Sequence, residues 1–248
     1  MLEKSLLRLY KPIHNRFFLR QFESAQNQSV SVSSIDWNAR VPDVRQLFSS
    51  NQDKITAIAI RILKLLDEWS REAGLEVFLA YGTLLGAIRH QGFIPWDDDI
   101  DVFMMKGDFN RLINSLHNLP HELALVPVSP NFFKLMDLSS IISKDGKRGV
   151  AVDIFIVNDT IPRVRSFFNV HTRSRVYFSS QDFHPARRVK FENEYFLTPN
   201  NATKILEKLY GDFMTPPELA DRVPSHIDYS RVRIEPYGSI IVDPKNCV

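Results

Sequence analysis

The stretch GTLLGAIRHQGFIPWDDDIDVFM (residues 82–104) joins a short helical pattern, a dense group of carboxylates and an apolar run. Its aspartates are Asp97, Asp98, Asp99 and Asp101. In an extended strand, successive side chains point to opposite faces, so Asp99 and Asp101 share one face. Ile100 and Val102 then point to the other, apolar face. The stretch therefore predicts a strand that carries two neighbouring carboxylates and is buried on its opposite side.

Two such carboxylates repel each other unless something neutralises them. At about 6 to 7 Å, with an effective dielectric constant near 20, the repulsion is roughly 2 to 3 kcal/mol. Protonation, a Lys or Arg partner, or a divalent cation would relieve it, and hard carboxylate oxygens suit Mg²⁺ or Mn²⁺. We therefore predict that Asp99 and Asp101 bind a metal ion, and that Asp97 and Asp98 form an acidic turn in solvent.

Three other motifs contain aspartates in a similar pattern. The sixth position of an EF-hand loop needs glycine, and Val102 stands there when the loop is counted from Asp97. A haloacid-dehalogenase-type phosphatase has its nucleophilic aspartate after an apolar strand, whereas here the strand follows the acids. A glycosyltransferase that holds Mn²⁺ with an Asp-x-Asp pair stays open as an alternative.

The residues upstream of the aspartates favour a further possibility, a nucleotidyltransferase fold. A short apolar strand over 76–81 is followed by Gly82 and Thr83, and then by a helical pattern over 84–90. This order is that of nucleotidyltransferase folds, where a glycine lets the backbone approach a phosphate and a hydroxyl at the helix start donates to it. Thr83 could instead be a simple N-cap, and both interpretations can hold together.

A third carboxylate and a lysine stand alone in other apolar strands. Asp153 is the only charge in VAVDIFIV (150–157), and a lone buried acid is costly without a partner. We predict that it completes the metal site or acts as general base, the alternative being an ion pair with an arginine such as Arg148. Lys134 is a candidate phosphate clamp or a snorkelling edge-strand lysine.

The remaining patterns predict a mixed α/β sheet protein of the α+β class, with the sheet flanked by helices. Residues 51–74 have apolar side chains three or four positions apart and end at a glycine, which is typical of an amphipathic helix. Further helices are predicted over 108–116, 162–178 and 200–210, and strands over 123–128, 132–137 and 139–143.

Composition limits the classes of function. Among 248 residues, 44% are hydrophobic and the formal charge is +2, so no global field favours nucleic acid. The single cysteine, Cys247, excludes an internal disulfide framework and a Cys-based zinc site. We find neither a membrane span nor a signal-peptide core and predict a cytoplasmic protein.

The chain divides into two parts by pattern. Residues 1–36 form an amphipathic arm followed by a Ser-, Gln- and Asn-rich linker, and residues 37–248 form the catalytic domain. The apolar and basic residues over 1–22 could rest on an anionic membrane surface, or pack on the chain's own domain as such stripes commonly do.

Several segments resemble one known family closely. GTLLGAIRHQGFIPWDDDIDV (82–102) resembles the signature of the LicD/fukutin phosphotransferases, and the likeness extends from about residue 75 to 217. The supporting segments are KLMDLSSII (134–142), AVDIFIVND (151–159) and NNATKILEKLYGDFMTPP (200–217). Two departures stand out: Met136 replaces a basic residue found in many relatives, and the zinc-binding cysteines of some animal members are absent.

The resemblance implies a nucleotidyltransferase-like fold and a metal-dependent transfer of a phospho-alcohol. A CDP-linked donor would supply phosphocholine or ribitol phosphate to a hydroxyl of a glycan or glycolipid, as in bacterial members that decorate lipopolysaccharide, teichoic acid or capsule. Asp99 and Asp101 would hold Mg²⁺ or Mn²⁺ against the donor diphosphate, and Asp153 would bind a second ion or take the acceptor proton. The phosphate-contacting residues would be Gly82, Thr83 and Lys134.

Other polar and aromatic residues of the motifs receive weaker assignments. Arg89 could pair with the acids or support the loop, and we expect support; His90 is expected to be a loop residue. Trp96 could stack on a ligand or pack in the core. Tyr210 and Asp212 could border the site, but the glycine between them is an ordinary helix C-cap, so we assign them no role.

Two functions compete with phospho-alcohol transfer. A glycosyltransferase should have a nucleotide-binding βαβ unit at the start of the chain, and the polar segment over 24–36 does not supply one. A non-catalytic scaffold of glycan assembly would be expected to lose its costly acids first, yet Asp99, Asp101 and Asp153 are all present.

Overall fold

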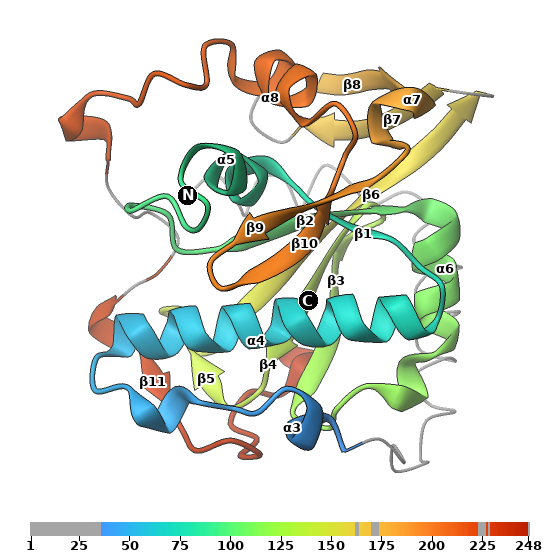
Figure 1. Ribbon diagram of the computed structural model, residues 1–248. Coiled ribbons are helices and arrows are strands. Elements are labelled where there is room, and N and C mark those ends of the chain that lie inside the picture. The colour runs from blue at the N-terminus through green and yellow to red at the C-terminus, as the bar shows by residue number, and fades with distance from the viewer. Residues whose placement is uncertain (1–35, 162–163, 170–173, 223–226, 228, 248) are drawn as a thin grey trace.

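The protein is built on a mixed β-sheet that helices cover (Figure 1). The computed structural model describes residues 36–161, 164–169, 174–222, 227 and 229–247. Apart from Asp36, the predicted arm and linker over 1–36 lie outside these residues, as does the predicted membrane contact over 1–22. Within the described part of the chain, none of the helices combines the length and the apolar character needed to span a bilayer.

The main sheet has its strands in the order β3-β4-β6-β2-β1-β10-β9, with β7 and β8 extending it from the far half of β6. Strands β2 and β6 run parallel, as do β1 and β10, whereas the other neighbours are antiparallel. The strands are β1 (Val77–Leu79), β2 (Ile100–Met105), β3 (Leu123–Ser129), β4 (Phe132–Asp137), β6 (Ala151–Ile161), β7 (Val164–Asn169), β8 (Ser174–Ser179), β9 (Arg187–Phe191) and β10 (Glu194–Thr198). A separate small sheet pairs β5 (Ser140–Ile141) with β11 (Arg233–Ile234).

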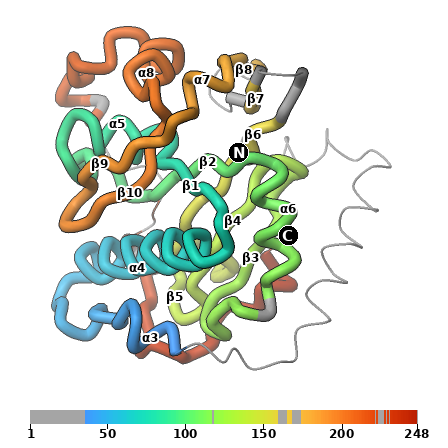
Figure 2. Tube along the Cα trace, turned by 45° about the vertical axis from the view of Figure 1, so that its right-hand side comes forward, coloured from blue at the N-terminus to red at the C-terminus, as the bar shows by residue number. Residues whose placement is uncertain are grey.

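Helices pack against the strands of this sheet (Figure 1). The α-helices are α3 (Trp37–Arg40), α4 (Asn51–Glu72), α5 (Tyr81–Arg89), α6 (Lys106–Asn114), α7 (Ser180–Phe183) and α8 (Ala202–Tyr210). Short 3-10 helices are η1 (Arg45–Leu47), η2 (Leu116–Asn118), η3 (Leu219–Asp221), η4 (Tyr229–Arg231) and η5 (Pro244–Asn246). Figures 1 and 2 show α5 and α8 side by side.

The longest helix, α4, follows directly from the sequence pattern. Ser50 caps its first turn by accepting from the Asp53 backbone N–H at 3.0 Å. The chain leaves it through Gly74, whose φ of +63° suits glycine. Its apolar stripe is buried against β1, β2, β4 and β6; the buried aliphatic and aromatic side chains are Ile55, Ile58, Ile62, Leu63, Leu65, Leu66 and Trp69.

Most predicted elements are present, with ends displaced by a few residues. The α+β class with a mixed sheet flanked by helices is confirmed. The helix predicted over 162–178 is wrong: this region contributes β7 and β8, a pair of antiparallel strands. Val176 and Phe178 are buried while Tyr177 between them is exposed, so the segment has the period of two of a strand. The hairpin formed by β9 and β10 was not predicted from the sequence pattern.

Candidate active site

The centre of the site is a pair of aspartates on adjacent parallel strands. Asp101 on β2 and Asp153 on β6 are Cα partners in the register of these strands. The flanking residues Ile100, Val102 and Ile154 are fully buried, which fixes the two strands in the core. The predicted meeting of Asp101 with a third carboxylate from a neighbouring strand is therefore observed in the fold.

Lys134 extends this row onto a third strand. It lies on β4 opposite Asp153, and its Nζ is 2.6 Å from each carboxylate oxygen. Asp153 is only 8% exposed, so the lysine neutralises a largely buried charge. The edge-strand interpretation of Lys134 is wrong, because β4 lies between β3 and β6 inside the sheet. Asp153 thus has the ion-pair partner that a buried acid requires, in Lys134.

The acidic segment crowds around Asp101. Burial raises the pKa of Asp101 well above its ordinary value, and the charges of Asp99, Asp153 and Asp97 raise it further. Part of Asp101 remains accessible to solvent, but its carboxyl group is packed in by protein and by these acids. In the absence of a cation, the site therefore favours the protonated form of Asp101.

Asp97 and Asp98 do not form a turn in solvent, and the prediction that they do is wrong. Both are half-buried. Asp97 folds back onto the first turn of α5, where a Cβ added at Gly82 would lie 2.5 Å from its Oδ2. The absence of a side chain at Gly82 thus lets a third carboxylate of the segment approach the site. The role of Gly82 against a phosphate stays a prediction.

Thr83 ties the helix to the acidic strand. Its Oγ1 accepts a hydrogen bond from the Asp101 backbone N–H at 2.8 Å, and the residue is buried. It is the third residue of α5, and the N-cap is Ala80, so the N-cap interpretation is wrong. The contact fixes the start of β2 relative to α5. Donation by the hydroxyl to a phosphate stays a prediction.

Two tyrosines belong to the same group, and the sequence analysis assigned neither to the site. Burial, and then the charges of Asp101, Asp97 and Asp99, raise the pKa of Tyr210. Burial, Asp101 and Tyr210 raise that of Tyr81. Although 39% of Tyr210 is exposed, the residue therefore lies near enough to the acidic segment for the charges of these aspartates to act on it.

Tyr81 also has an unusual backbone. Its φ is +40°, in the left-handed region that non-glycine residues rarely adopt, and it is the first residue of α5. Its buried ring is 5.1 Å from the Phe103 ring and 4.8 Å from the Phe155 ring, measured between centroids. Such strained positions concentrate at functional sites and are held by the surrounding packing.

Arg89 supports the loop after α8, as expected. Its Nη1 donates to the carbonyl oxygen of Phe213 at 2.7 Å. This contact joins the end of α5 to the segment that follows α8, whose last residue is Tyr210. The sequence pattern did not indicate this contact, because the two residues are 124 positions apart in the chain.

The donor set fits a hard divalent cation, although it does not form a complete cage. In the residues that the structure describes, no group of three or more His, Cys, Asp or Glu is arranged to hold a metal ion. Mg²⁺ is commonly bound by one or two carboxylates together with substrate phosphates. That Asp99 and Asp101 supply this pair stays a prediction. Burial and the charges of Asp99, Asp153 and Asp97 raise the pKa of Asp101, so negative charge is concentrated at this point.

Comparison with known proteins gives a consistent assignment. A family model described as LicD/FKTN/FKRP, nucleotidyltransferase domain, matches residues 74–201. The lipopolysaccharide cholinephosphotransferase LicD of Haemophilus influenzae is 31% identical over 137 residues, which are 50% of this chain and 51% of the relative. An uncharacterised protein of Rickettsia prowazekii is 26% identical over 157 residues, covering 62% of this chain and 54% of the relative.

Among solved structures, a lincomycin-bound lincosamide antibiotic adenylyltransferase, LnuA, matches with a TM-score of 0.37 and 13% identity. This match covers 59% of the chain and 83% of the other protein. The chain spans about half the length of the curated relatives it matches.

Proposed function

The chain belongs to the LicD family of nucleotidyltransferase domains, and from this membership we propose that it is a metal-dependent phosphotransferase. It would move a phospho-alcohol, such as phosphocholine, from a CDP-linked donor to a hydroxyl of a cell-surface glycan or glycolipid. The observation that carries the proposal is the row of Lys134, Asp153 and Asp101 across three adjacent strands. Asp99 lies just before β2, near enough for its charge to raise the pKa of Asp101.

The roles follow from position and charge. Asp99 and Asp101 would hold Mg²⁺ or Mn²⁺, which when bound would neutralise the donor diphosphate. The acceptor hydroxyl oxygen forms a bond to the phosphorus that carries the alcohol, and the bond from that phosphorus to the bridging oxygen breaks, so that cytidine monophosphate leaves. Asp153, which forms an ion pair with Lys134, would take the hydroxyl proton.

The residues around this row position its aspartates. Thr83 fixes the backbone of Asp101, and Gly82 leaves room for Asp97. Phosphoryl transfer needs little covalent chemistry from the protein, so small displacements of these groups should change the rate strongly.

Release of cytidine monophosphate tests the function. The purified chain is incubated with CDP-choline, CDP-ribitol and CDP-glycerol, each with glycan acceptors and with Mn²⁺ or Mg²⁺. We expect release with one donor, dependent on metal and acceptor, and loss of release in Asp101→Asn. The matched control is Asp145→Asn, in an exposed loop with local contacts only.

Each other outcome refutes the proposal in a defined way. Turnover of sugar nucleotides in place of CDP-alcohols would identify a glycosyltransferase. No turnover of either class, with the metal bound and the fold intact, would identify a scaffold of glycan assembly. Undiminished release in Asp101→Asn would remove Asp101 from the mechanism.

A further inference from the structure

A group of basic and aromatic side chains lies directly beside the acidic segment. It consists of Arg89, His90, Trp96 and Arg222, and we call it the arginine cluster. The Arg222 guanidinium carbon is 5.0 Å from the centroid of the Trp96 ring, and the His90 ring meets Trp96 edge-on at 6.3 Å. Trp96 immediately precedes Asp97, so the cluster adjoins the proposed active site.

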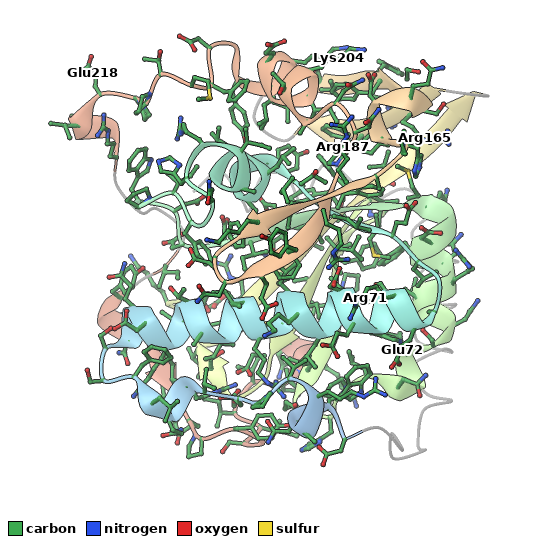
Figure 3. The ribbon with its side chains drawn as sticks, in the orientation of Figure 1. Arg71, Glu72, Arg165, Arg187, Lys204 and Glu218 are labelled. Carbon is green, nitrogen blue, oxygen red and sulfur yellow. The ribbon has the colours of Figure 1, made fainter. Side chains whose placement is uncertain are left out.

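The cluster brings together two positive charges that the described residues do not neutralise. Neither Arg89 nor Arg222 has a carboxylate partner among the described residues. Glu218, four positions before Arg222, points away from the body of the molecule (Figure 3). Burial, together with the Arg222 charge, lowers the pKa of Arg89, which shows that the two guanidiniums repel each other.

Both arginines are nevertheless held in place. Arg89 donates through Nη1 to the Phe213 carbonyl at 2.7 Å, and Arg222 donates through Nε to the Pro217 carbonyl at 2.8 Å. Trp96 adds a cation–π contact to Arg222. Backbone carbonyls and a ring fix the positions of these guanidiniums but cancel little of their charge. Two like charges held together in this way are typical of an anion site.

The N–H groups of Arg222 that make no contact within the described residues indicate which kind of anion the cluster would bind. A guanidinium has five N–H groups, and the contacts of Arg222 within the described residues use its Nε alone. Planar guanidinium groups bind phosphate oxygens through paired N–H···O bonds. A phosphate monoester dianion or a diphosphate matches both the charge and the donor geometry of two arginines.

We propose that Arg89 and Arg222 together bind a phosphate group of one of the two substrates, with Trp96 holding Arg222 in position. The inference deepens the proposed function, since it assigns a recognition site next to the carboxylates. The phosphate could belong to the donor diphosphate or to a phosphorylated glycan acceptor, and both sources present the same chemistry to the cluster.

Direct titration tests the site without relying on catalysis. Inorganic phosphate and pyrophosphate are titrated into the full chain by calorimetry in EDTA, which removes any contribution from a metal ion. We expect one site, weakened roughly 10- to 100-fold in Arg222→Gln, as expected for the loss of hydrogen bonds to a charged group. Arg222→Lys, which keeps the charge and loses the fork, should be intermediate.

The matched control is Arg231→Gln. Arg231, an exposed arginine, likewise donates to a backbone carbonyl, that of Lys144 at 3.0 Å, and its replacement changes the net charge equally. It should bind pyrophosphate like the unchanged chain. Equal binding by Arg222→Gln and Arg231→Gln, both folded by thermal unfolding, would overturn the proposal. Pyrophosphate binding by Arg89→Gln, measured in the same way, tests the other arginine of the cluster independently.

Steady-state kinetics identify the source of the phosphate. If it is the donor diphosphate, Arg222→Gln raises KM for the CDP-linked donor and leaves KM for the acceptor unchanged. If it belongs to the acceptor, KM rises for the phosphorylated acceptor, and the penalty disappears with a dephosphorylated one. Unchanged KM for both substrates would refute a role in transfer. Because the titration requires no turnover, failure of the proposed function would not be mistaken for failure of the phosphate site.

Discussion

Asp101 on β2 and Asp153 on β6 are direct partners across two parallel strands, and the Lys134 ammonium binds the second aspartate but is not hydrogen-bonded to the first. This difference in their contacts with Lys134 separates the two aspartates electrostatically. Asp153 has its counter-charge within the sheet, whereas burial and neighbouring acids raise the pKa of Asp101. Asp101 is therefore the carboxylate that an added cation would affect most.

Replacing Asp101 should increase the stability of the metal-free protein while abolishing transfer. The folded-state pKa of Asp101 is raised, so ionisation opposes folding, and stability falls as pH rises from the unfolded value of about 3.9 through the folded value. In EDTA near pH 8, Asp101→Asn should have the higher Tm. Relief of one like-charge pair is worth roughly 2 kcal/mol, or about 4 to 8 °C. The gain should shrink toward about pH 4.

Asp145→Asn is the control, because ionisation of Asp145 has the opposite effect on folding stability. A hydrogen bond from Ser143 lowers the pKa of Asp145, so its ionised form favours folding, above all at neutral pH. This variant should gain no stability. A lower Tm for Asp101→Asn than for the unchanged chain at high pH would contradict the electrostatic account of the site.

Replacing Lys134 should destabilise the metal-free protein, because Asp153 would lose its partner inside the sheet. Lys134→Met keeps much of the side-chain volume and leaves a largely buried carboxylate without its counter-charge, at a cost of roughly 1 to 3 kcal/mol. Urea unfolding measures the loss. Lys190→Met, on the exposed face of edge strand β9, is the control and should cost little. Equal losses in the two variants would refute the role of the Lys134 ion pair.

For stability and for transfer, the hydroxyl group of Thr83 should matter more than the branched shape of its side chain. Thr83→Val keeps the branched form but removes the acceptor of the Asp101 backbone N–H, with an expected loss of roughly 1 to 3 kcal/mol and a lower rate of transfer. Thr83→Ser keeps the hydroxyl and should retain most of both. Unfolding by urea and release of cytidine monophosphate are measured in parallel. Equal behaviour of the two variants would show that the hydrogen bond does not position Asp101.

A methyl group at Gly82 should weaken cation binding without unfolding the protein. The added Cβ would lie 2.5 Å from Oδ2 of Asp97, at the end of a side chain that can move away. Gly107→Ala is the matched control, since it also lies in the first turn of a helix and its Cβ would meet nothing within 4 Å. Each alanine favours helix by roughly 0.5 to 1 kcal/mol. Mn²⁺ affinity by electron paramagnetic resonance should fall for Gly82→Ala alone; equal affinities would contradict the placement of Asp97.

The elements and acids that the sequence predicted correctly depend on strong local patterns. α4 repeats its apolar residues at helical spacing, and β2 and β6 are apolar runs each interrupted by an aspartate. Asp153 was expected to join Asp101 because a lone buried acid is costly without a partner, and the register of β2 and β6 brings the two together.

The features that were missed depend on tertiary contacts. Tyr210 reaches the acids only because α8 packs on α5, and nothing within its own segment indicates this. Asp97 looked like part of a solvent turn because its contact with Gly82 depends on how the chain folds back over α5. The mixed spacing of apolar residues over 162–178 predicts a helix, but the described residues of this segment pair as β7 and β8.

Location of a metal ion in the crystal tests the central claim most directly. Crystals are soaked in Mn²⁺ with the CDP-linked donor, and anomalous difference density is recorded. The account predicts a manganese peak bound by the carboxylates of Asp99 and Asp101 and by the donor diphosphate. A fully bound donor with no manganese peak at these two aspartates would contradict it.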